Sequence, residues 1–211
     1  MNWILIGVLL SAFFILGISR LSACIRAVAF QGALLSVLPI FVKGWNDPHA
    51  LFLFGGTLII KAMVIPSLLF RSIREATIRE EAEPIVSLHL SLLGGGGIMV
   101  AAFSSLNALP HLAPPFSPLF IPAALSIVLI GLFLLISRTK AISQVIGFLV
   151  LDNGIFLFGM TLVAEFPMTV ELGVLLDLLV GVFVMGIMIY HINRTFDHID
   201  TGALATLRDT E

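Results

Sequence analysis

Long apolar runs fill most of this chain, and short polar, charged or proline-rich segments separate them. Each run is long enough, or nearly so, to cross the roughly 30 Å hydrocarbon layer of a bilayer as an α-helix. The predicted fold class is therefore all-α, a polytopic membrane protein. We predict seven transmembrane helices, at residues 2–18, 27–42, 50–70, 85–106, 118–137, 141–163 and 170–192.

The composition points to lipid as the solvent of this chain. Of its 211 residues, 59% are hydrophobic and 11% are charged, whereas soluble domains carry about 25% charged residues. A soluble core of this size cannot hide so much apolar surface. The single cysteine, Cys24, excludes an internal disulfide. The net charge of −2, without a basic patch, argues against nucleic acid as a partner.

The basic residues predict how the helices are oriented. Successive loops alternate between rich and poor in Lys and Arg, and the positive-inside rule places the rich loops in the cytoplasm. The poor side holds only Lys43, and Lys61 lies within a helix. The rich side holds Arg20, Arg26, Arg71, Arg74, Arg79, Arg138, Lys140, Arg194 and Arg208. We therefore expect the N-terminus outside and the C-terminus in the cytoplasm.

Three ionisable residues lie inside the predicted helices, where a charge is costly. Asp152 and Lys61 lie near the middle of their runs, and Asp177 lies about a third of the way into its run. An ionisable group at that depth costs about 2.5–3.5 kcal/mol or more, so it usually faces the protein interior and marks an ion or proton path. We predict a role in proton transfer for all three.

Each of these residues also has a plainer interpretation. Asp152 could be a protonated acid that holds helices together by hydrogen bonds. Asp177 lies close enough to the interface to be hydrated there. Lys61 could form a buried ion pair with Asp152 or with another subunit. Pro66 cannot donate a helical hydrogen bond, so we expect a kink beside Lys61.

Four further polar residues are secondary candidates. Asn153 adds a polar neighbour to Asp152, and Gln31 lies in the second predicted helix, where helix packing is its plainer role. His89 and His191 could pass protons to the cytoplasm, although each is also read as an interfacial histidine. No metal-ligand spacing and no nucleophile–base pair is evident. We therefore expect no cofactor, no metal and no catalysis by this chain alone.

The stretch 137–159, SRTKAISQVIGFLVLDNGIFLFG, joins a basic tight turn to a helix with the pattern Gly-x-x-x-x-acid-Asn. It resembles the component E membrane subunit of group 4 nickel–iron hydrogenases of the formate-hydrogenlyase type. The Lys-x-x-x-x-Pro pattern from Lys61 to Pro66 is similar to the same family, as is the tail run from Asp197 to Leu204. The resemblance covers most of the chain, and its motifs are specific in combination.

The last three predicted helices also resemble the K subunit of respiratory complex I and its relatives in multisubunit Na⁺/H⁺ antiporters. In that subunit the buried acid follows the glycine by two positions. Leu149 holds that position here, and Asp152 lies one helical turn further on, on the same face. Component E commonly has Glu at this site, so Asp152 is one methylene shorter. Asp177 resembles the acid in the last helix of both families.

The resemblance implies a membrane-arm subunit of a complex-I-like redox complex in a bacterial or archaeal inner membrane. The implied partners are lipid, antiporter-like and quinone-site-type membrane subunits, and a peripheral hydrogenase or iron–sulfur module. The implied parts are a three-helix segment with a cytoplasmic connector (1–83), a four-helix segment ending in K-like helices (84–192) and a cytoplasmic tail (193–211). Two alternatives stay open: a K-like subunit of a cation/proton antiporter, and a passive membrane scaffold.

Overall fold

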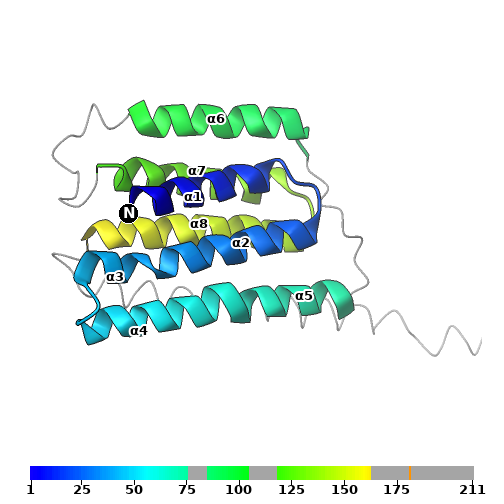
Figure 1. Cartoon of the computed structure of the whole chain (residues 1–211). Coiled ribbons are helices and arrows are strands. Elements are labelled where there is room, and N and C mark those ends of the chain that lie inside the picture. Colours follow the sequence, from blue (N-terminus) through cyan, green and yellow to red (C-terminus); the bar gives the residue numbers. More distant parts are fainter. Residues whose placement is uncertain (76–84, 105–117, 163–180, 182–211) are drawn as a thin grey trace, which may run out of the picture.

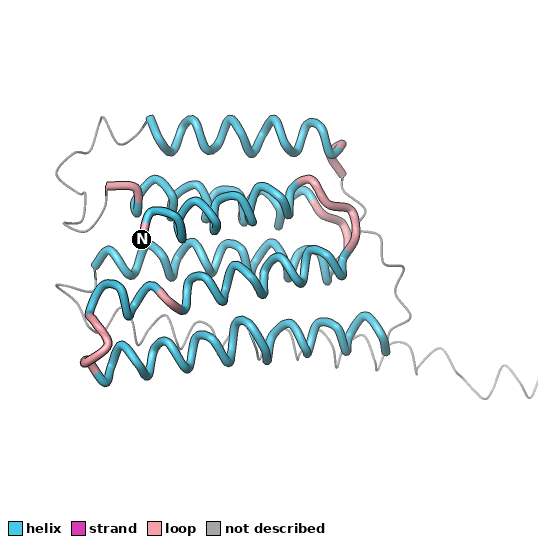
Figure 2. The backbone as a smooth tube through the Cα atoms, viewed as in Figure 1, coloured by secondary structure: helices cyan, strands magenta, loops and turns pink. Residues whose placement is uncertain are grey.

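The structure, a computed structural model, describes residues 1–75, 85–104, 118–162 and 181. Within these ranges the chain forms helices joined by short turns and contains no strand, which confirms the all-α prediction (Figure 2). The described helices are α1 (Asn2–Leu16), α2 (Leu21–Ser36), α3 (Leu38–Lys43), α4 (Pro48–Thr57), the π-helix η1 (Leu58–Val64), α5 (Ile65–Glu75), α6 (Leu88–Ser104), α7 (Phe120–Ser137) and α8 (Ala141–Leu162).

The helices lie side by side as one bundle (Figure 1). The helices α1 and α2 form a hairpin, and α7 and α8 form a second hairpin that packs against the first. The helix α6 covers one edge of the bundle, where it contacts α1 and α7. At the opposite edge, α4, η1 and α5 form one long rod against α2. This arrangement packs both the rod and α8 against α2.

Four helical segments are long and apolar enough to cross a membrane: Leu21–Lys43, Pro48–Arg74, Phe120–Ser137 and Ile142–Thr161. The helices α1 and α6 are apolar but shorter. The surface is apolar where a soluble protein would be polar, since Trp3, Phe52 and Leu93 are each more than two-thirds exposed. Several polar side chains lie inside instead. Together these features indicate a membrane protein.

One predicted boundary was wrong. The second predicted helix began at residue 27, but α2 begins at Leu21. The polar turn was extended too far because Arg26 reads as a loop residue, whereas its side chain points out of the bundle while Cys24 and Ile25 are buried. The other described helices lie within the predicted spans apart from a few end residues and the added turn of α5. The seventh predicted helix lies outside the described residues apart from Gly181, and the tail 193–211 lies outside them entirely.

Glycines hold α7 and α8 at unusually close range. A Cβ built on Gly154 would lie 2.6 Å from the backbone nitrogen of Val128, and one on Gly147 would lie 2.7 Å from that of Leu135. A Cβ built on Gly131, which lies on α7, would likewise overlap the backbone of Leu151 on α8. Small residues allow such backbone approach between membrane helices. This contact fixes α8, and with it Asp152, in the centre of the bundle.

Candidate functional site

The structure pairs Lys61 with Asp152. The Lys61 Nζ atom donates to Asp152 Oδ2 at 2.7 Å, across 91 residues of sequence. The two residues are 4% and 2% exposed, so the pair lies inside the protein. A buried ion pair between these two residues was one of the alternatives for Lys61, and the structure contains this ion pair. The pair joins the rod to α8 through the bundle interior.

A π-helix carries Lys61. The residues of η1, Leu58–Val64, follow α4 without a break, and the backbone N–H of Ile65 donates to the carbonyl of Ile60. A π-helical turn inserts one extra residue into an α-helix and is often found at functional sites. The sequence predicted a kink beside Lys61 because of Pro66. The structure has this π-helix there instead, and it ends just before the α-helix that contains Pro66.

Three further polar groups extend the pair across the bundle. Lys61 Nζ also donates to Asn153 Oδ1 at 3.0 Å, and Asn153 Nδ2 donates to Gln31 Oε1 at 2.9 Å. Gln31 Nε2 then donates to the backbone carbonyl of Val8 at 3.1 Å. We call Lys61, Asp152, Asn153 and Gln31 the buried polar network. Its hydrogen bonds run from η1 to α8, from α8 to α2, and from α2 to α1. Each of the four residues is at most 4% exposed.

The ammonium of Lys61 has an aromatic neighbour as well. It lies 4.9 Å from the centre of the Phe156 ring, one helical turn beyond Asp152 on α8. A cation within about 6 Å of an aromatic face is attracted by the ring electrons, more strongly when water is excluded. If Asp152 gains a proton, the lysine therefore keeps the Asn153 amide and this ring as partners. The geometry can thus accommodate both a charged and a neutral Asp152.

The remaining predicted residues divide into two groups. His89 lies exposed in the first turn of α6, at the edge of the bundle and away from the network. Asp177 and His191 lie outside the described residues.

Thr57, one turn before Lys61, is a buried polar residue that the sequence did not single out. Its hydroxyl has no hydrogen-bond partner in the described structure. Its i, i+4 spacing to Lys61 was the signal that could have identified it.

Sequence comparison places the chain beside a mycobacterial protein. It is 37% identical over 205 residues to the "Uncharacterized protein Rv0085" of Mycobacterium tuberculosis, covering 96% of this chain and 93% of that protein. The chain belongs to the same family as that protein. No model of a known protein family matches the chain, and no solved structure matches it. The family is thus shown by overall sequence identity, and the site must be interpreted from its own geometry.

Proposed function

We propose that this chain is a membrane-arm subunit of a complex-I-like, membrane-bound hydrogenase or related oxidoreductase complex. In this proposal Lys61 and Asp152 form part of a proton-translocation path. The observation that carries it is the buried Lys61–Asp152 ion pair between two apolar helical segments. Placing two charges there is expensive, and packed apolar side chains of similar size would often be as stable or more so. A role in moving charge explains why both are present.

The proposed step uses only groups in the network. A proton that reaches Asp152 neutralises the carboxylate and weakens its hold on the ammonium. Lys61 keeps Asn153 Oδ1 and the Phe156 ring as neighbours and passes its own proton onward. The proton on Asp152 then moves to the neutral lysine amine, and the ion pair re-forms. The amides of Asn153 and Gln31 orient the lysine and do not themselves carry the proton, because each has one fixed acceptor and one fixed donor end. The predicted acid Asp177 would serve the same path.

The proposal includes a topology and a set of partners. The chain would cross a bacterial or archaeal inner membrane seven times, with its C-terminus in the cytoplasm. It would hold no cofactor and catalyse no reaction alone. Its partners would be antiporter-like and quinone-site-type membrane subunits and a peripheral hydrogenase or iron–sulfur module. Proteins that copurify in mild detergent test this directly: a nickel- and iron-containing module is expected. Antiporter subunits without any redox module would favour the antiporter alternative instead.

The passive scaffold is a second candidate, and one observation favours it. All four members of the buried polar network make hydrogen bonds to one another or to backbone. A fully satisfied network of this kind can specify a unique helix packing without moving any proton. The two functions differ in what they require of Asp152: a relay needs an acid, whereas a scaffold needs only a hydrogen-bonding side chain.

Replacement of Asp152 by Asn separates the two functions. Asparagine keeps the size and a carbonyl acceptor for Lys61 but cannot take up a proton. In inverted membrane vesicles we expect the Asp152→Asn complex to assemble and reduce an artificial electron acceptor normally while proton transport is lost. Asp152→Glu should retain much of the transport, because the acid remains.

The matched control is Asp47→Asn. Asp47 caps α4 by accepting from the backbone N–H of His49, and asparagine caps equally well. This variant should transport protons like the unmodified complex. Normal proton transport in a well-assembled Asp152→Asn complex would refute the relay and leave the scaffold.

A further inference from the structure

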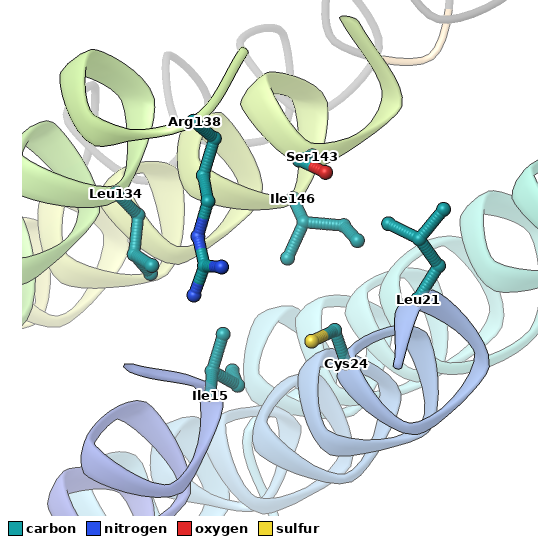
Figure 3. A pocket seen from close by; sticks show the side chains of 7 residues that line it. All are labelled: Ile15, Leu21, Cys24, Leu134, Arg138, Ser143 and Ile146. Carbon is teal, nitrogen blue, oxygen red and sulfur yellow. The ribbon is translucent and has the colours of Figure 1, made fainter. Parts of the chain in front are cut away.

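A second buried charge lies at the end of the bundle where α1 and α7 end and α2 and α8 begin. Arg138 follows α7, and its backbone is extended (φ −110°, ψ 138°), which ends the helix. The side chain turns into the bundle and is only 3% exposed. Figure 3 shows its guanidinium directed toward Ile15. In the sequence Arg138 is a loop charge that sets orientation, and the proposed function makes no use of its buried position.

The hydrogen bonds of Arg138 use one side of the guanidinium. Its Nη2 donates to the carbonyl of Leu16 at 3.4 Å, which satisfies a free carbonyl at the end of α1. Its Nη1 is buried and has no hydrogen-bond partner in the described structure. Gln144 Nε2 donates to the Arg138 carbonyl at 3.1 Å and holds the turn in place. Burial lowers the pKa of the Arg138 guanidinium because the charged form loses its hydration.

A small cavity lies beside this guanidinium. The cavity has a volume of about 10 Å³, measured as the space that the centre of a water molecule can occupy, so it has room for one small occupant. Arg138, Ser143 and Cys24 line it together with aliphatic side chains (Figure 3). The hydroxyl of Ser143 is also buried and has no hydrogen-bond partner in the described structure. Two of the residues that line this one cavity therefore each carry a buried polar group without a described partner.

The chemistry of these groups selects the kind of occupant. Arginine can only donate hydrogen bonds and carries a full positive charge. None of the described residues that line the cavity is acidic, so these residues supply no counter-charge. A buried charge is stable only when it is paired and hydrogen-bonded. A water molecule would supply an acceptor but no charge. A small anion would supply both and would also accept from the Ser143 hydroxyl.

We infer that Arg138 and Ser143 form a binding site for a single small monovalent anion of about the size of chloride. The site joins four helix ends: Arg138 caps α1 and ends α7, Ser143 lies in the first turn of α8, and Cys24 lies in the first turns of α2. The positive ends of the α2 and α8 dipoles add to the attraction for a negative charge. Binding would therefore lock the two helical hairpins together. This inference is independent of the proton-path proposal.

Thermal unfolding of the purified chain in detergent tests the inference. Helical circular dichroism is followed in sodium chloride, sodium bromide or sodium gluconate at equal ionic strength. A ligand that binds only the folded state raises the midpoint in a saturating way. We expect chloride and bromide to raise the midpoint and then saturate. Gluconate is too large for the cavity and should not. Equal midpoints in all three salts would overturn the inference.

Three variants identify the site. Arg138→Gln removes the charge and should abolish the difference between chloride and gluconate. Ser143→Ala keeps Arg138 and removes one donor, so the half-saturating chloride concentration should rise about tenfold. This second variant decides the matter if Arg138→Gln does not fold. Arg26→Gln removes an exposed charge from α2 and should respond like the unmodified chain. An unmodified chloride response in Ser143→Ala would place the anion elsewhere and refute the site.

Discussion

Gly32 and Lys61 lie so close together that only a glycine fits between α2 and η1. A Cβ built on Gly32 would lie 2.7 Å from the Cβ of Lys61 and 3.3 Å from its carbonyl carbon. Gly32 follows Gln31 in the sequence, so one short segment of α2 both admits the lysine backbone and supplies a member of the buried polar network. The position of Lys61 thus depends on an apolar contact as well as on its ion pair.

Replacement of Gly32 by Ala should therefore disturb the network without changing any of its polar side chains. The added methyl group meets the base of the Lys61 side chain and its backbone, which cannot rotate away. Overpacking of this kind typically costs about 1–3 kcal/mol. We expect a lower unfolding midpoint in detergent for Gly32→Ala. Gly55→Ala and Gly56→Ala on α4 are matched controls, because nothing lies within 4 Å of a Cβ at either position. Equal midpoints for all three variants would contradict the close contact.

The Lys61–Asp152 pair makes a second, energetic prediction. Lys61→Met leaves the Asp152 carboxylate buried without its counter-charge, and loss of one partner of a buried pair costs about 3–5 kcal/mol. Asp152→Leu removes the carboxylate that pairs with the ammonium. The double variant removes both charges, so it should be more stable than either single variant. Chemical unfolding of the four proteins in detergent measures this coupling.

Lys43→Met is the control for the lysine change, since Lys43 lies at the end of α3 and is only half-buried. It should have a small effect and should not couple to Asp152→Leu. Strictly additive losses for Lys61→Met and Asp152→Leu would show that the two charges do not stabilise each other in solution.

Part of this site could be predicted from the sequence, because depth in an apolar run identifies a residue without any knowledge of its partners. Asp152 and Lys61 were selected in this way, and their ion pair was one of the alternatives considered. The helices followed from run length alone, since a segment in lipid must satisfy its backbone internally. Boundaries were harder: an arginine on an exposed helix face, such as Arg26, looks the same as one in a loop.

The connectivity of the network could not be predicted in this way. Gln31 reaches Asn153 and the Val8 carbonyl only because α2 lies between α1 and α8, and helix order in a bundle is not encoded in any single run. Arg138 was misjudged for a related reason. Its place in a basic turn identified it only as a loop charge that sets orientation, but the extended backbone follows the end of α7 and its side chain is buried.

The proposed topology makes a third prediction. Because nine of the eleven Lys and Arg residues fall on one side, a cytoplasm-dependent reporter fused after Glu211 should be active. The same reporter inserted within 107–118, the loop before the fifth predicted helix, should be inactive. A second reporter that is active only outside the cytoplasm serves as the control and should give the opposite pattern. Activity of the cytoplasmic reporter in the loop insertion would reject seven helices with an external N-terminus.

The last prediction separates the charge of Lys61 from its ability to release a proton. Arginine keeps the positive charge, can donate to Asp152 and Asn153, and does not deprotonate in proteins. Lys61→Arg should therefore preserve most of the pairing energy that Lys61→Met loses, so its unfolding midpoint should lie nearer that of the unmodified chain. Proton transport by the assembled complex should nevertheless be lost, as in Lys61→Met, because a permanently charged group cannot complete the step. Lys43→Arg, at the end of α3, should change neither property. A stable Lys61→Arg complex that transports protons normally would show that Lys61 acts only as a fixed counter-charge, and the relay would then have to run through Asp152 without it.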